Sequence, residues 1–312
     1  MEPVITDNVS SQLFTERIEL YKLLGTGTYA YTYGGTYNNI NVVIKIIFKP
    51  ETRKLFNELI VLRTIKDLNI NISKLISNIF INVDDPSIKL FKEDILNKEY
   101  SNRVHLIIFE YIGGLDLYYI FMDTRRMKTY DGFLDREKKS LVYTPRKALT
   151  LISQMTTILE ILHNNGCVHR DIKPENIIYS DSEDKYSLID FGLSTIIENN
   201  SLVGTPGYVP IFIIDYYKNN RKISLEICKI SDIFALAVTI YVIIYEKHPF
   251  NLHRGRLNYN NSDYQRPKLI NLNDEIENKL VLLIEGILLH PENFTPSMIR
   301  VQVNGWTSPS IE

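Results

Sequence analysis

The fold assignment rests on two stretches of the chain, VHRDIKPENIIY (residues 168–179) and LIDFGLST (residues 188–195). Taken alone, the aspartate and asparagine side chains in them would be interpreted as helix caps and turns. Working outward, apolar side chains repeat at helical spacing from Pro145 to His163, and Gly166 provides a C-terminal stop. Both stretches are therefore expected to follow a long helix near the middle of the chain.

The second half of the chain is predicted to be mainly helical. Further helices are expected at Ser231–Tyr245 and Asp274–Leu289, whereas the charged, aperiodic stretch 124–143 is expected to be a surface insertion. The longest apolar run, Ile233–Tyr245, is shorter than the roughly 20 residues of a bilayer span. We interpret it as a buried helix and expect no membrane segment.

The first half has the pattern of an antiparallel sheet. From Ile18 to Phe48, β-branched and aromatic residues are punctuated by GTG, GG and NN, as in successive hairpins. A helical stretch follows Pro50, and another strand pair is expected at 76–83 and 104–111, with a polar insertion between them. The IGG sequence after this pair is interpreted as a hinge, which places the domain boundary near Gly113.

Composition and charge argue against several classes of protein. The 312 residues carry a formal net charge of −2, which does not provide the basic surface that nucleic acid or acidic lipid requires. Cys167 and Cys228 lie in separate apolar stretches, so neither a disulfide framework nor a zinc site is predicted. The N-terminus lacks the features of a secretory signal, so we expect an intracellular protein, cytoplasmic with the nucleus left open. The oligomeric state is left open.

The positions of Lys45 and Glu58 are best understood if the two side chains form a pair. Lys45 ends the expected strand VVIK, and Glu58 falls on or beside the inward face of the next helix. Lys45 alone could extend along the surface to water, but an inward carboxylate is costly unless it is paired. We therefore expect an ion pair between these two side chains.

The glycine-rich stretch LGTGTYAYTY, with Gly25 and Gly27, is a weak signal by itself, because most such glycines lie in ordinary turns. A dinucleotide-binding turn would lead into a helix, whereas the residues after these glycines alternate like a strand. The glycines are therefore expected at a hairpin tip, where the absence of Cβ lets the backbone approach phosphate oxygens.

Taken in order, the glycine-rich hairpin, VVIK, HRDIKPEN, DFG and GTPGY resemble the motifs of the eukaryotic protein kinase superfamily. The resemblance covers about residues 18–306 and implies a bilobal α+β fold. It implies an antiparallel sheet with one main helix in 18–112, a mainly helical lobe in 113–306, and tails at 1–17 and 307–312. ATP and Mg²⁺ are the implied cofactors, and protein serine or threonine side chains are the implied substrates.

The resemblance also implies roles for the residues that match the motifs. Asp171 is expected to accept the proton of the substrate hydroxyl. Lys173 is expected to contact the moving phosphoryl group, and this lysine is what places the match among serine/threonine kinases. Asn176 and Asp190 are expected to bind magnesium, which requires hard oxygen ligands. Thr205 is expected to approach Asp171 and Lys173.

The nucleotide contacts are implied in the same way. Lys45, held by Glu58, is expected at the α- and β-phosphates, and Phe109 is expected to close the back of the adenine pocket. The remaining contacts, with the glycine-rich loop, the adenine and the ribose, are expected at Leu24, Gly25, Gly27, Thr32, Val43, Glu110, Ile112, Asp116 and Ile178. His169 and His163 are expected to be structural rather than catalytic.

One segment departs from the family pattern. Pro210, Ile211 and Phe212 stand where the family has Ala-Pro-Glu, and Phe294 stands where the arginine partner of that glutamate is expected. Replacing a whole buried ion pair by apolar groups can be neutral or stabilising, so we expect Phe212 and Phe294 to pack together. Ser201 stands where an activating phosphate often lies in the family, although an ordinary exposed loop serine fits equally well.

Two alternatives to an active protein kinase are considered. The first is an ATP-binding pseudokinase that serves as a scaffold, which only the changed 210–212 segment supports. The second is a small-molecule phosphotransferase, which Lys173 and the GTPGY loop argue against.

Overall fold

The computed structural model describes residues 18–26, 30–48, 53–82, 103–122, 145–198, 201–220, 222–250 and 274–307. The chain divides into two compact units, Met1–Lys66 with Ser73–Ile112, and Asp67–Ile72 with Gly113–Glu312. The second unit resumes at Gly113, where the boundary was predicted, but it also takes in Asp67–Ile72. This short segment joins the second unit because Leu188 N–H donates to the Asn71 carbonyl at 3.0 Å.

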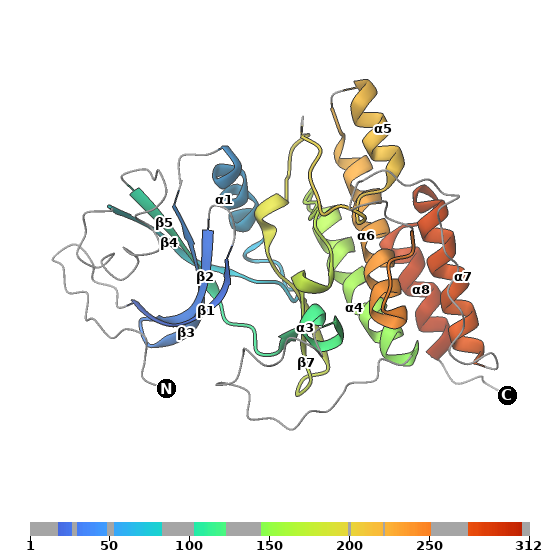
Figure 1. The fold of residues 1–312 in the computed structure, drawn as a ribbon, viewed down its shortest axis with the longest axis horizontal. Coiled ribbons are helices and arrows are strands. Elements are labelled where there is room, and N and C mark those ends of the chain that lie inside the picture. The colour runs from blue at the N-terminus through green and yellow to red at the C-terminus, as the bar shows by residue number, and fades with distance from the viewer. Residues whose placement is uncertain are drawn as a thin grey trace. The chain divides into compact units, whose positions relative to one another are not determined.

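The first unit is a five-stranded antiparallel sheet with one main helix, α1 (Arg53–Ile65) (Figure 1). Its strands, in the order β1-β2-β3-β5-β4, are β1 (Ile18–Thr26), β2 (Ala30–Tyr37), β3 (Ile40–Ile47), β5 (Arg103–Glu110) and β4 (Leu75–Asn82). The predicted sheet and the predicted strand pair are therefore present, with ends that differ by a residue.

Alternation along β3 separates the core side of the sheet from its functional side. Val42, Ile44 and Ile46 are buried in one cluster, and because successive side chains of a strand point to opposite faces, Lys45 points to the other face. Burying each of these aliphatic side chains contributes about 1.5–3 kcal/mol. The core of the sheet thereby fixes the direction of the Lys45 side chain.

The second unit is mainly helical, with a three-stranded sheet at one end (Figure 1). Its helices are α3 (Leu117–Met122), α4 (Pro145–Asn164), α5 (Ile211–Asn220), α6 (Leu225–Tyr245), α7 (Glu275–Leu289) and α8 (Pro296–Thr307). Its strands are β6 (Leu115–Asp116), β7 (Ile177–Ser180) and β8 (Lys185–Leu188). Helix α4 packs against α6, α7 and α8, which makes it the centre of this unit.

Two of the predicted helices have the expected bounds. Helix α4 begins at Pro145, and Gly166 follows it in the left-handed conformation, with φ of 70°. Helix α7 is preceded by Asp274, whose carboxylate caps the helix by accepting from the N–H groups of Ile276 and Glu277. Helices α3, α5 and α8 were not predicted. The expected insertion at 124–143 and the expected tail at 1–17 lie outside the described residues.

Helix α6 is longer than predicted. It begins at Leu225 rather than Ser231, because the Ser224 hydroxyl caps it and Lys229 and Glu226, which break the apolar run, pair with each other at 2.7 Å. With 21 residues it is long and apolar enough to cross a membrane, so the length argument from the sequence was wrong. Its most apolar window is 83% buried inside the fold, as in the core helix of a globular unit.

Candidate functional site

Asp232 of α6 holds the loop that carries the HRD sequence. Its carboxylate is fully buried and accepts from the backbone N–H groups of His169 at 2.8 Å and Arg170 at 2.7 Å, and from His163 Nε2 at 3.0 Å. Burial raises the pKa of this carboxyl, but the hydrogen bonds and the histidines outweigh burial, so its pKa lies below the ordinary value. One ionised side chain thereby fixes the backbone of this loop.

Asp232 was not predicted from the sequence. The signal was available, because SDIFALAV places one carboxylate inside the most apolar helix of the chain. A charged group at such a position must find hydrogen-bonding partners on folding. The partners themselves could not be named, because they lie 62 to 69 residues away in the chain.

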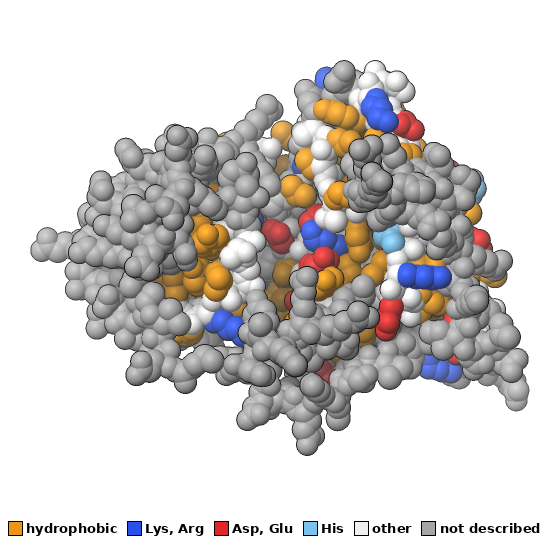
Figure 2. All heavy atoms as spheres, in the orientation of Figure 1, with side chains coloured by type: hydrophobic (Ala, Val, Ile, Leu, Met, Phe, Trp, Pro, Cys, Tyr) orange, Lys and Arg blue, Asp and Glu red, His pale blue; other side chains and the backbone are white. Residues whose placement is uncertain are grey.

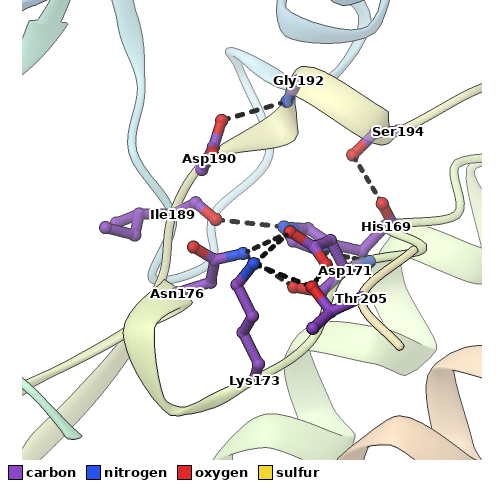
Figure 3. A network of polar contacts seen from close by, with 9 residues as sticks. All are labelled: His169, Asp171, Lys173, Asn176, Ile189, Asp190, Gly192, Ser194 and Thr205. Atoms are coloured by element: carbon purple, nitrogen blue, oxygen red, sulfur yellow. Dashed lines mark hydrogen bonds and ion pairs between the residues drawn. The ribbon is translucent and has the colours of Figure 1, made fainter. Parts of the chain in front are cut away.

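His169 braces the same loop through both of its ring nitrogens (Figure 3). Its Nε2 lies 3.0 Å from the Ile189 carbonyl, which can only accept, so Nε2 carries the proton. Its Nδ1 accepts from Asp171 N–H at 3.3 Å, and its ring meets the buried Phe191 ring edge-on, with centroids 4.9 Å apart. Both nitrogens are engaged by the backbone, as the predicted structural role requires.

Asp171, Lys173, Asn176 and Thr205 form one polar cluster (Figure 3). The Thr205 hydroxyl donates to Asp171 Oδ1 at 2.6 Å and accepts from Lys173 Nζ at 2.9 Å. Lys173 Nζ also lies 2.9 Å from Asp171 Oδ2. The predicted approach of Thr205 to Asp171 and Lys173 is confirmed. An aliphatic hydroxyl therefore fits between this carboxylate and this ammonium group.

Asn176 ends the short 3₁₀ turn Pro174–Asn176, which leads into β7. Its Nδ2 donates to the Asp171 carbonyl at 2.7 Å and to Asp171 Oδ2 at 3.1 Å. These bonds fix the amide plane, and no hydrogen bond to its Oδ1 occurs from the residues that the structure describes. An amide oxygen held in this way is a suitable ligand for a hard cation.

Asp190 is positioned by its backbone. It lies in the left-handed region with φ of 59°, which costs a residue other than glycine about 1–3 kcal/mol. The turn persists because its neighbours are held, with Phe191 buried and the Ile189 N–H donating to the Asn176 carbonyl at 2.9 Å. The carboxylate is exposed and points toward Gly192 N–H, at 3.3 Å, rather than into the Asp171 cluster (Figure 3).

Lys45 and Glu58 form the predicted ion pair in the first unit. The distance from Lys45 Nζ to Glu58 Oε1 is 2.7 Å, and the Glu58 side chain is only 4% exposed. Because removal of Lys45 would leave the buried Glu58 carboxylate without this counterion, the ion pair ties strand β3 to helix α1. The Lys45 side chain remains 19% exposed, so it can still meet a ligand.

The expected nucleotide contacts are distributed over both units. Leu24, Gly25, Thr32, Val43, Glu110 and Ile112 lie in the first unit, Asp116 and Ile178 in the second, and Gly27 outside the described residues. Gly25 pairs with Thr32 between β1 and β2, and a Cβ at Gly25 would meet no atom within 4 Å. Asp116 pairs with Ile178 between β6 and β7. Burial raises the pKa of the Asp116 carboxyl, although it accepts from Tyr119 N–H at 2.7 Å.

The prediction that Phe212 and Phe294 pack together is wrong. Phe212 lies in the first turn of α5 and is 36% exposed. The Phe294 ring instead lies over α7, where a Cβ on Gly286 would come within 3.0 Å of its Cζ. Among the described residues, no aromatic contact joins Phe212 to Phe294. Phe294 therefore fills space beside α7, while Phe212 remains at the surface.

The surface of the molecule brings charges of both signs together. Figure 2 shows basic and acidic side chains side by side near the middle of the view, with apolar side chains around them. Among the residues that the structure describes, no group of three or more His, Cys, Asp or Glu side chains is arranged to hold a metal ion.

Comparisons with known proteins match the chain to a family. The model of the protein kinase domain matches residues 18–298. Calcium/calmodulin-dependent protein kinase type 1 of Caenorhabditis elegans is 25% identical over 247 residues, which cover 75% of this chain and 58% of that protein. The type 1B kinase of Homo sapiens is 34% identical over 121 residues, which cover 37% of this chain and 33% of that protein.

A solved structure shows the same fold. The kinase PK-1 of Cydia pomonella granulovirus matches with a TM-score of 0.63 and 20% identity, over 90% of this chain and 92% of that chain. The expected kinase-like α+β fold is confirmed by this match. The chain spans 42% of one relative, the type 1 kinase of Caenorhabditis briggsae, and 58% of the C. elegans relative, so it corresponds to part of their length.

Proposed function

We propose that this chain, which belongs to the protein kinase family, transfers the γ-phosphate of ATP to serine and threonine hydroxyls of protein substrates. The observation that carries the proposal is the contact of Thr205 with both Asp171 and Lys173. That internal hydroxyl donates to the carboxylate and accepts from the ammonium group at once. A substrate hydroxyl in the same environment would meet a proton acceptor and a cation together.

Asp171 is proposed as the group that orients and deprotonates the substrate hydroxyl. Its backbone is set by the loop that Asp232 anchors, and both carboxylate oxygens are held by side chains of the cluster. Phosphoryl transfer depends mainly on positioning and charge neutralisation, so a carboxylate held from several sides suits this role.

Lys173 is proposed to stabilise the charge on the moving phosphoryl group. Its Nζ lies beside both Asp171 Oδ2 and the Thr205 hydroxyl, which keeps the cation where a hydroxyl oxygen attacks. A cation fixed before the reaction stabilises developing negative charge without reorganising. The short reach of the cluster favours aliphatic hydroxyls over the phenol of tyrosine.

ATP and magnesium are the proposed cofactors. Asn176 and Asp190 offer the hard oxygen ligands that magnesium prefers, and Lys45 offers the cation for the α- and β-phosphates. When bound, the metal would neutralise the charge of the phosphates. The residues Leu24, Thr32, Val43, Glu110, Ile112, Asp116 and Ile178 are proposed to contact the nucleoside.

The pseudokinase alternative has no observation in its favour. Its only support was the altered segment Pro210–Phe212, yet helix α5 forms directly from Ile211 and the Thr205 contacts are intact. The motif residues of both units also make their contacts, because Lys45 is paired with Glu58 and Asn176 donates to Asp171.

The proposal is tested by transfer of labelled γ-phosphate to a library of serine, threonine and tyrosine peptides, with and without magnesium. We expect magnesium-dependent labelling of serine and threonine peptides, and a loss of about 10²- to 10⁴-fold in Asp171→Asn. Wild-type protein that binds ATP but labels no peptide would contradict the proposal. Equal labelling by wild type and Asp171→Asn would assign the activity to a contaminant.

A further inference from the structure

His248 lies outside every motif that the sequence analysis used, in the connection EKHPF that follows α6. Both of its ring nitrogens are engaged. Nε2 lies 3.1 Å from the Gly207 carbonyl of the GTPGY sequence, and Nδ1 accepts from Phe250 N–H at 3.1 Å. His248 therefore connects two segments that lie 41 residues apart in the chain.

The hydrogen-bond partners determine which nitrogen carries the proton. The Gly207 carbonyl can only accept, so Nε2 donates to it. Nδ1 lies 3.1 Å from both the N–H and the carbonyl of Phe250, and in the neutral ring with its proton on Nε2 it accepts from the N–H. Burial lowers the pKa of His248 below its ordinary value, against the opposing effect of the two carbonyls, which favours the neutral ring. One nitrogen thus acts as a donor to the GTPGY turn and the other as an acceptor.

The side of His248 that faces Phe250 is fixed to the core. Phe250 is 2% exposed, and its ring stacks on Phe234 of α6 with centroids 6.0 Å apart. The acceptor bond at Nδ1 therefore ties the imidazole to the most buried helix of the second unit. From this base, Nε2 reaches the Gly207 carbonyl, and the Tyr208 ring packs edge-on against the imidazole at 6.1 Å.

Gly207 belongs to the turn that carries Thr205. The turn is closed by Tyr208 N–H, which donates to the Thr205 carbonyl at 3.0 Å, and Gly207 adopts the left-handed conformation with φ of 88°. Since Thr205 contacts Asp171 and Lys173, any movement of this turn moves the hydroxyl that lies between them. Gly207 is buried, so its carbonyl needs a hydrogen-bond donor inside the fold, and His248 Nε2 is in place to provide it.

We propose that His248 is a positioning residue for the substrate peptide, which acts by fixing the Thr205–Tyr208 turn through its Nε2 donor to Gly207. The inference deepens the proposed function and rests on it. His248 touches neither Asp171 nor Lys173 by a described contact, so its effect reaches the reacting groups only through Gly207. Loss of the donor is expected to weaken peptide engagement while leaving ATP binding unchanged.

Two variants separate the two nitrogens. His248→Gln places an amide near the position of Nε2 and can still donate to Gly207, whereas His248→Asn places one near Nδ1 and can still bond Phe250. Peptide kcat/KM is expected to fall about tenfold in His248→Asn, mainly through KM, and to remain near the wild-type value in His248→Gln. KM for ATP is expected to stay unchanged in both.

Amide exchange provides a readout that does not depend on activity. Tyr208 N–H, which closes the turn, is expected to exchange faster in His248→Asn than in His248→Gln or the wild type. The inference is overturned if His248→Asn retains both the wild-type kcat/KM and the wild-type exchange rate. It is also overturned if His248→Gln falls as far as His248→Asn, because the Phe250 contact would then be the one that matters.

The outcomes distinguish this inference from the proposed function. A wild-type protein that labels no peptide defeats the proposed function, and the exchange of Tyr208 N–H then still shows whether His248 holds the turn. An active wild type whose His248→Asn variant matches it in both measurements defeats the inference alone.

Discussion

The two units hold their charged and titratable groups differently. In the first unit, Glu58 is paired with Lys45 by one short contact. His105 is fully buried, and neither of its ring nitrogens has a hydrogen-bond partner among the residues that the structure describes. In the second unit, the buried Asp232 accepts from three groups, and each nearby histidine is hydrogen-bonded. Substituting one residue of an isolated ion pair removes that one interaction. Substituting the central residue of a hydrogen-bond network affects every group of the loop that the network holds.

The largest effect is expected from breaking the anchor of the network. Asp232→Ala would leave the N–H groups of His169 and Arg170 without their acceptor in the interior, so we expect the free energy of unfolding to fall by about 3 to 5 kcal/mol. Urea unfolding followed by circular dichroism measures this change. Asp232→Asn, which keeps one carbonyl acceptor, is the matched control and should lose less. A change below about 1 kcal/mol in Asp232→Ala would show that the loop is held by other contacts.

A smaller effect is expected from breaking the pair. Glu58→Gln removes the charge next to Lys45 but keeps the shape, and Lys45 can turn partly toward water because it is 19% exposed. We expect KM for ATP to rise about tenfold and the free energy of unfolding to fall by about 1 kcal/mol. Steady-state kinetics at varied ATP, with Glu226→Gln on the exposed α6 pair as control, check this. An unchanged KM for ATP would separate the pair from nucleotide binding.

The smallest effect is expected from His105, the buried histidine of the first unit. Its ring stacks on Phe80 at 4.0 Å, and burial, with a contribution from Arg63, lowers its pKa to about 4. The unfolded chain therefore binds a proton near pH 6.5 while the folded chain remains neutral until about pH 4. The free energy of unfolding should fall by on the order of 2 kcal/mol as pH drops across this window.

His105→Leu provides the control for this pH dependence. It removes the titrating group without removing any hydrogen bond to the described part of the chain, where neither nitrogen has a partner. Unfolding in urea at several pH values between 4 and 6.5 should give a flatter profile for His105→Leu than for the wild type. Equal slopes for the two proteins would mean that His105 is hydrated or protonated in the folded state.

The same contrast explains what could be predicted from the sequence. Lys45 and Glu58 are thirteen residues apart, so strand and helix patterns were enough to predict their pairing. Asp171 and Asn176, five residues apart, were identified through the resemblance to the kinase family. The partners of Asp232, and the Gly207 partner of His248, lie 41 to 69 residues away in the chain. Local patterning cannot identify such contacts, because it does not say which elements pack together.

The errors have the same origin. The predicted start of helix α6 lay too late in the chain because Glu226 and Lys229 interrupt the apolar run. In the structure these two residues pair with each other on the helix. The predicted contact between Phe212 and Phe294 rested only on the joint replacement of an expected ion pair. In the structure the Phe294 ring lies against Gly286 of α7. The short helix α3 was missed because its six residues are too few to show a period.

Helix α6 also has a consequence for biosynthesis. It packs against α4, which is made before it, and against α7, which is made after it. During translation there is an interval in which α6 has left the ribosome but Glu275–Leu289 has not. In this interval the 21-residue apolar helix exposes the side that α7 later covers. Nascent chains that stall in this interval should be the ones that chaperones retain or that aggregate.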